Sequence, residues 1–231
     1  MEFENKLIAG TLIKRYKRFF IDIKLDNKTV TAHCPNTGSM MGLLKKGNKV
    51  WVTKSNNIKR KLKYTLQIIE TNKKKVGVNT HITNKIVKEA LENKLITYFN
   101  KKITIQAEKK FNNNTRFDFL ISDNEKKTFI EVKNVTLKRK NKVAEFPDAI
   151  TTRGLKHLKE LINAKKKGYN SLLLFLIQRD DCKLFKIASD IDIDYLKNLK
   201  IAIKQKVNIA AYDCKFLKNG ITLNKKIKLK I

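Results

Sequence analysis

Cysteine is scarce in this sequence: the 231 residues include three, Cys34, Cys182 and Cys214. Their number is odd, they lie far apart, and none belongs to a C-x-x-C pair. This pattern argues against a disulfide framework and against a cysteine-rich zinc site. The sequence therefore predicts a protein of a reducing compartment.

Long hydrophobic runs are also missing. The longest, residues 172–177, is far shorter than the roughly 20 apolar residues that a membrane-spanning helix needs. The opening MEFENKLIAG has no basic stretch leading into an apolar one, so it predicts no signal peptide. We therefore expect a cytoplasmic protein without a membrane partner.

Acidic residues are few. The chain has 21 Asp and Glu against 52 Lys and Arg, a net charge of +31, while 42% apolar residues argue against wholesale disorder. Such an excess of one sign repels itself, and a polyanion is the partner that relieves the repulsion. With 45 lysines but only 7 arginines, part of the excess is typical of an AT-rich genome, which does not explain why Asp and Glu are scarce. The charge predicts a nucleic-acid partner, DNA in the first instance.

Residues 1–80 show the short alternating pattern of β-strands. The predicted strands are 7–13, 19–25, 29–34, 49–53 and 61–69. Such a series of short strands favours a small OB-like β-barrel as the first, DNA-binding domain. The polar and basic segment 71–75 is the first candidate for its boundary.

Residues 81–231 predict an α/β domain, which makes the whole chain α+β. Asp148 is expected to cap a long helix that Gly168 ends. Residues 171–178 contain the continuous apolar run 172–177, as in a strand that is buried on both faces. The predicted order is helix 84–95, strands 102–107, 115–122 and 128–135, helix 148–167, strand 171–178, helix 193–205 and two further strands.

The second and third strands of this domain carry the residues with most chemistry. Alternation places Asp118, Glu131 and Lys133 on one face of a hairpin. The apolar residues between them are expected on the other face: Phe117, Phe119, Ile130 and Val132. If the turn centres on residues 124–125, Asp118 lies directly opposite Glu131.

Two carboxylates in directly opposite positions have Cβ atoms about 4.5–5.5 Å apart, and their repulsion costs stability. A divalent cation, Mg²⁺ or Mn²⁺, would remove that cost, and Mg²⁺ commonly binds one or two carboxylates together with phosphate oxygens. Asp118 and Glu131 are therefore the predicted metal ligands, and Lys133 would stabilise charge on a phosphate. The alternative is an exposed lattice of ion pairs with little energetic consequence.

E-x-K alone carries little information, since it occurs five times in the chain. Only the copy at Glu131 lies in an apolar strand that follows a matching acidic strand. The element order, with Asp on the second strand and E-x-K on the third, resembles the PD-(D/E)XK nuclease core. That resemblance implies a catalytic set of Asp118, Glu131 and Lys133, with Glu89 of the first helix as an added acid. Glu89 could equally belong to a solvated helix face, and Phe117 stands where the pattern has proline.

Several phrases of the sequence are together similar to one family, the sugar fermentation stimulation protein A family. This resemblance implies DNA binding, an OB-like N-terminal part and a nuclease-like C-terminal domain. Two other functions stay open: a non-enzymatic DNA-binding regulator of sugar (maltose) metabolism genes, and an RNA-binding accessory protein. The phrases are GTLIKRYKRFF (10–20), AHCPNTGSM (32–40), RKLKYTL (60–66), VGVNT (76–80), EVKNVTL (131–137) and FPDAITTRGLKHLKEL (146–161).

Cations interleave with aromatic residues at positions 14–19. The cations could neutralise phosphates while Tyr16 or Phe19 stacks on a base. Alternatively, Phe19 and Phe20 enter the core and the cations are merely solvated. The predicted nucleic-acid contacts are Lys14, Arg15, Lys17, Arg18, Arg60, Lys61, Arg116 and Arg153.

Two further segments have an open interpretation. The loop 33–40 could hold a phosphate through backbone amides, or be a rigid turn that needs Gly38. On the long helix, Arg153, His157 and Glu160 share a face. His157 could assist at the site, although a structural histidine is the interpretation we favour from sequence.

Overall fold

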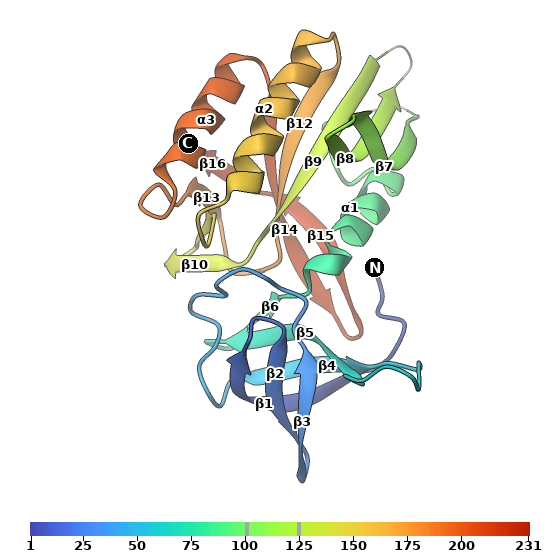
Figure 1. The fold of residues 1–231 in the computed structure, drawn as a ribbon, viewed down its shortest axis with the longest axis vertical. Helices are drawn as coiled ribbons and strands as arrows, with labels where there is room; N and C mark the ends of the chain where they lie inside the picture. The colour runs from blue at the N-terminus through green and yellow to red at the C-terminus, as the bar shows by residue number, and fades with distance from the viewer. Residues whose placement is uncertain (100–101, 124–125) are drawn as a thin grey trace.

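The computed structural model describes residues 1–99, 102–123 and 126–231. A small barrel forms one end of the molecule, and a larger α/β part forms the other (Figure 1). This is the predicted α+β architecture, with the barrel first in the chain. Among the described helices, none has the length and apolar character required to cross a bilayer.

The barrel is a sheet of six strands in the order β3-β2-β1-β4-β5-β6, closed by a short parallel pairing of β3 with β5. Alternate residues point inward, so Leu12, Ile21, Val50 and Leu66 are fully buried in one core. Gly10 lies where β1 crosses β2, and a Cβ there would stand 2.5 Å from Leu25. The strands are β1 (Leu7–Tyr16), β2 (Phe20–Leu25), β3 (Lys28–His33), β4 (Lys49–Lys54), β5 (Tyr64–Thr71) and β6 (Lys74–Gly77).

The segment 71–75 is a hairpin turn, not a domain boundary, so that sequence prediction is wrong. Asn72 and Lys73 have φ angles of 51° and 59°, and β5 pairs with β6 on either side of them. Left-handed conformations at both central positions give the tight two-residue turn that joins twisted antiparallel strands. A polar, basic composition suits such a turn as well as it suits a linker.

The α/β part is built on a sheet with the order β15-β14-β12-β9-β8-β7. Its centre, β9, β12 and β14, is parallel, and β12 is buried on both faces as predicted. One face packs against α1 and the other against α2 and α3 (Figure 1). The elements are α1 (Thr83–Glu92), β7 (Thr104–Asn112), β8 (Thr115–Asp123), β9 (Lys126–Val135), α2 (Thr152–Lys166), β12 (Asn170–Ile177), α3 (Ile193–Lys204), β14 (Asn208–Leu217) and β15 (Gly220–Lys226).

A second, smaller sheet was not predicted. It has the order β10-β11-β13-β16 and lies beside α3. Each of these strands is only three or four residues long, too short for an alternation to stand out from chance. The strands are β10 (Leu137–Lys140), β11 (Val143–Phe146), β13 (Leu184–Ile187) and β16 (Lys228–Lys230).

The long helix α2 begins at a different cap from the predicted one. Thr151 is the N-cap residue, and its side chain accepts a hydrogen bond from the amide of Gly154. The Asp148 carboxylate instead accepts the amide of Met40 at 3.2 Å, so it joins the barrel to the α/β part. Gly168, with φ 87°, ends the helix as expected.

The two parts of the chain are joined by backbone pairing. Val76 of β6 forms an antiparallel bridge with Arg179, and the amide of Gly77 donates to Gln178 O at 2.9 Å. A short 3₁₀ turn, Thr80–Ile82, then leads into α1. At the other side, the amide of Phe3 donates to Asn219 O. These contacts fix the barrel against the carboxyl end of β12.

Arg15 holds the loop that follows β3. Its guanidinium donates to the carbonyl oxygens of Asn36, Gly38 and Arg18, at 2.7, 3.0 and 2.9 Å. Arginine presents its donors in a rigid fork, so one side chain can satisfy several carbonyls of a loop. Arg15 is therefore engaged in holding the loop, and its role as a phosphate contact stays a prediction.

We expect Arg15→Ala to lower the free energy of unfolding by about 1–3 kcal/mol, because the loop carbonyls lose their donor. The neighbouring exposed Arg18→Ala should change it by less than about 0.5 kcal/mol. Urea denaturation of both variants measures the difference. Equal stability of the two variants would contradict the assignment of Arg15 as a loop clamp.

Candidate metal centre

The predicted hairpin forms in the predicted register. Phe119 pairs with Ile130 and Leu120 with Phe129, as the predicted register requires, and this regular pairing ends before Asp118 and Glu131. The turn at residues 124–125 lies outside the described residues. The alternation prediction fails at one position: Phe117 packs with Phe129 on the α2 side, whereas Phe119 and Ile130 pack on the α1 side.

Strand β8 is irregular at Asp118, and this irregularity orients the carboxylate toward two hydrogen-bond donors at the edge of the site. Its Oδ2 accepts the amide of Val132 at 2.7 Å, and its Oδ1 accepts Nδ2 of Asn84 at 2.7 Å. Both donors are neutral groups. Burial and the nearby charge of Glu131 raise the pKa of Asp118 to about 6, despite these hydrogen bonds.

The pKa of Glu131 is shifted in the opposite direction from that of Asp118. It is 3% exposed, and Lys133 Nζ donates to its Oε1 at 2.7 Å. His157 Nδ1, from α2, hydrogen-bonds to the same oxygen and lies 3.1 Å from Lys133 Nζ. Burial alone would raise the pKa of Glu131, but the bonds and charges of His157 and Lys133 outweigh it and lower the pKa.

These side chains line a pocket of about 360 Å³ where β8, β9, α1 and α2 meet the 3₁₀ turn. Arg153 lies at its rim, with Nε 3.5 Å from His157 Nε2. Thr80 and His81 close the pocket on the side of the barrel. The site therefore combines two carboxylates, two cations and a histidine within reach of one ligand.

A divalent cation fits the carboxylate pair. Asp118 is a half-buried acid whose hydrogen-bond donors are neutral, and the neighbouring charge that raises its pKa, that of Glu131, outweighs the opposing charge of Lys133. Carboxylate oxygens are the ligands that Mg²⁺ and Ca²⁺ prefer. Among the described residues, no three His, Cys, Asp or Glu side chains are grouped to hold a metal. An ion at this site would therefore complete its coordination with water or phosphate oxygens.

The structure does not bring Glu89 to the site. Its Oε1 lies 2.6 Å from the backbone nitrogen of Met1, and the residue is absent from the lining of the pocket. The prediction of Glu89 as a third acid is wrong because its position on α1 faces β15 and the N-terminal segment. Asn84, one turn and a half earlier, is the α1 residue that contacts Asp118.

Arg116 is also outside the pocket. It is exposed and pairs across the sheet with Lys110 of β7, away from Lys133. Its side chain faces solvent on the outer strands, so it stays a predicted phosphate contact of the outer surface. Arg153 is the predicted arginine that the fold does bring to the carboxylates.

The remaining predicted contacts lie on the barrel. Lys17 and Arg18 are exposed in the turn between β1 and β2, with φ angles of 45° and 59°. Lys14 is exposed at 4.0 Å from Asp22. Arg60 lines a separate pocket of about 580 Å³, and Lys61 next to it is exposed.

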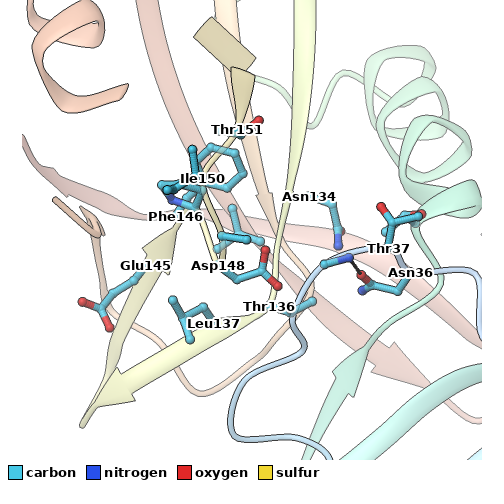
Figure 2. Close-up of a pocket in the computed structure, with 15 residues that line it drawn as sticks. Asn36, Thr37, Asn134, Thr136, Leu137, Glu145, Phe146, Asp148, Ile150 and Thr151 are labelled. Carbon is cyan, nitrogen blue, oxygen red and sulfur yellow. Dashed lines mark hydrogen bonds between the residues drawn. The ribbon is translucent and has the colours of Figure 1, made fainter. Parts of the chain in front are cut away.

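The loop 33–40 is a rigid connection to the α/β part. Figure 2 shows Asn36 and Thr37 on one side of a pocket and Asp148 on the other. Ser39 Oγ donates to the carbonyl of Asp148 at 2.8 Å, and a Cβ at Gly38 would lie 2.5 Å from Asp148 Oδ2. These contacts favour the rigid turn that needs Gly38, since the amide of Met40 and the hydroxyl of Ser39 are already bonded.

Sequence reasoning undervalued His157 and missed Asn84. His157 is buried and hydrogen-bonded, as a structural histidine would be, but its partners are the two charged residues of the site. The sequence signal for His157 was its position four residues after Arg153, on the same face of the helix. Asn84 had none, because an asparagine at the start of a helix is ordinary.

Residues 13–78 match the family described as the SfsA N-terminal OB domain, which agrees with the expected OB-like barrel. Residues 81–220 match the sugar fermentation stimulation protein RE domain. A sugar fermentation stimulation protein homolog of Pelagibacter ubique is 57% identical over 229 residues, covering 99% of both chains. The homolog of Pseudoalteromonas atlantica is 43% identical over 233 residues, again with 99% of each covered.

One solved structure, that of Pyrococcus furiosus SfsA in complex with Ca²⁺, has the same fold. Its TM-score is 0.90 at 24% identity, and the match covers 100% of this chain and 98% of that one. The two family matches together span most of the sequence, and the relatives align over nearly their full length. The chain therefore belongs to the sugar fermentation stimulation protein family.

Proposed function

We infer that this protein binds DNA and hydrolyses its phosphodiester bonds with a divalent cation held by Asp118 and Glu131. The observation that carries the catalytic part is the state of Asp118, a half-buried carboxylate with a raised pKa beside a second carboxylate and no cation in its hydrogen bonds. Such a group gains most from a metal ion. The ion takes the place of the proton on the carboxylate and removes the repulsion between the two carboxylates.

Each residue of the pocket has a role that follows from its contacts. Lys133, 2.7 Å from Glu131, is placed to stabilise negative charge that develops on a phosphate. His157 hydrogen-bonds to Glu131 and fixes its orientation. Arg153 at the rim can contact a neighbouring phosphate. The bound ion would lower the pKa of a water molecule and polarise the phosphate.

The choice of ion rests on the donor set and on a relative. Oxygen donors favour hard cations, and the Pyrococcus furiosus protein was solved with Ca²⁺. We propose Mg²⁺ or Mn²⁺ as the ion of the reaction.

DNA as the substrate rests on charge. The net charge of +31 and the exposed cations of the β1–β2 turn are suited to a phosphate backbone. A regulator that binds DNA without cleaving it, or an RNA-binding protein, would share this charge. The experiments below separate these possibilities.

DNA affinity should depend steeply on salt. With six to ten phosphate contacts, raising salt from about 50 to 200 mM should weaken binding about 10³- to 10⁵-fold, because each contact releases counterions. Fluorescence anisotropy of a labelled duplex over this range measures the effect. An affinity that is indifferent to salt would contradict an electrostatic interface.

Millimolar Mg²⁺ or Mn²⁺ should raise the thermal midpoint of the wild-type protein, since an ion that binds the folded state stabilises it. Asp118→Asn should abolish this response. The wild-type response should also grow as the pH rises through about 6, where Asp118 loses its proton. A response that persists unchanged in Asp118→Asn would place the ion elsewhere.

The same substitution should have a second effect without metal. The folded pKa of Asp118 lies above its ordinary value of 3.8, so its contribution to stability is present at low pH and is lost as the pH rises through about 6. The thermal midpoint of Asp118→Asn relative to wild type should therefore increase from about pH 5 to about pH 7.5.

Binding and cleavage should be separable. Lys133→Ala should lower the single-turnover cleavage rate about 10²- to 10³-fold at saturating protein while DNA is still bound. The double variant Lys17→Ala/Arg18→Ala should flatten the salt slope by nearly two units and leave the metal response intact. If Lys133→Ala weakens binding as much as the double variant, and no cleavage appears with any divalent ion, the protein is a DNA-binding regulator.

A further inference from the structure

Three aromatic rings form a series on the barrel surface that ends at the catalytic pocket. The ring centroids of Phe19 and His33 are 6.5 Å apart, with their planes within 18°. The next pair, His33 and His81, is 6.1 Å apart with a tilt of 44°. We call Phe19, His33 and His81 the ring ladder.

The ladder is open to solvent at both ends. Phe19 is 44% exposed, so its ring is accessible to a ligand. His81 is exposed and His33 is half-buried between them. Burial, and then the charges of Arg60 and His81, lower the pKa of His33, so this ring is uncharged near neutral pH. All three rings can therefore offer an aromatic face.

Cations accompany the ladder. His33 and His81 line a pocket of about 580 Å³ together with Arg60, Lys54 and Lys85. Two carboxylates, Glu2 and Glu4, also line this pocket, and Glu4 lies 3.7 Å from Lys85, so the positive charge is partly neutralised there. Lys17 and Arg18 directly precede Phe19 at the other end. Aromatic rings with cations beside them are the combination by which proteins hold unpaired bases and their phosphates.

The ladder leads to the proposed active site. His81 lines both the pocket that contains Arg60 and the pocket that contains Asp118, Glu131 and Lys133. A strand whose bases follow the rings would thus carry its backbone into the carboxylate pocket. The barrel and the α/β part are fixed to each other by the pairing of β6 with residues 178–179, so this path is built into the fold.

We propose that the ring ladder stacks the bases of single-stranded DNA and guides that strand to the Asp118–Glu131 pocket. This inference rests on the proposed function and specifies its substrate class. Duplex DNA cannot use the ladder, because its bases are stacked on one another and present only their edges in the grooves. An unpaired strand or a single-stranded end is therefore the form that the ladder recognises.

The test is a comparison of single-stranded and duplex DNA of equal length, without divalent ions, by fluorescence anisotropy. Wild-type protein should bind the single strand more tightly. Phe19→Leu and His81→Ala should each weaken single-strand binding roughly 5- to 150-fold, as expected when one base loses its stacking partner. Duplex affinity should change less than about twofold. Phe19→Tyr should retain the wild-type affinity because it keeps the ring.

Tyr98→Leu is the matched control, since Tyr98 is 38% exposed and belongs to the α/β part. It should leave single-strand affinity unchanged, and thermal midpoints of all variants check their folding. Oligonucleotides containing 2-aminopurine give a direct measure of stacking. Their fluorescence should be quenched by wild-type protein and less so by Phe19→Leu.

The outcomes separate this inference from the proposed function. Equal affinity for both DNA forms, or unchanged single-strand binding in Phe19→Leu and His81→Ala, would overturn the ladder while leaving DNA binding in place. Tighter binding of matched single-stranded RNA would overturn the assignment to DNA. If the ladder variants behave as expected but no divalent ion supports cleavage, the ladder stands and the proposed hydrolysis fails.

Discussion

The amide side chain of Gln178 ties together the segments on which the arrangement of the molecule depends. It is completely buried at the end of β12, and its Nε2 donates to Asn134 Oδ1 at 2.6 Å. The same nitrogen lies 3.3 Å from Thr83 Oγ1 and 3.5 Å from Asn79 O. These buried hydrogen bonds constrain every segment that supplies an acceptor, whereas the Oε1 of the same side chain has no partner among the described residues. Here those segments are β9, the start of α1 and the link from the barrel, and all three border the candidate site.

The carboxylate pair shows how two neighbouring strands, β8 and β9, can hold two acids in different states. Glu131 is compensated by Lys133 and His157, whereas Asp118 has only neutral donors. An acid whose hydrogen-bond donors are all neutral and which lies beside a second carboxylate is destabilising when ionised, and stability alone gives no reason to keep one. A site that binds a cation does give such a reason, because the repulsion in the free protein becomes attraction in the bound one. This is the physical basis for placing function at this end of the sheet.

Arginine content is a weaker guide to nucleic-acid contacts than it first suggests. Arg15 donates hydrogen bonds to loop carbonyls, Arg139 pairs with Glu145 and Asp190, and Arg179 is buried against Asp181. These residues use the same forked geometry for internal acceptors that others would use for phosphate. The cations that remain available are mostly exposed lysines, with Arg18, Arg60, Arg116 and Arg153 among the arginines.

Local sequence patterns determined the elements and the pairing of the acidic hairpin. Alternation and turn residues indicated the barrel strands, and the length of the hairpin alone gives the register that pairs Phe119 with Ile130. The sequence could not determine which helix residues reach that hairpin. Glu89 and Asn84 lie on the same helix, and only the packing of α1 against the sheet decides that Asn84 contacts Asp118. The same holds for the strand irregularity at Asp118. It also holds for the approach of His157 and for the ring ladder, which bring together residues that are far apart in the chain. Periodicity describes neighbours within one element, whereas these contacts depend on how whole elements pack, and the tertiary structure alone decided them.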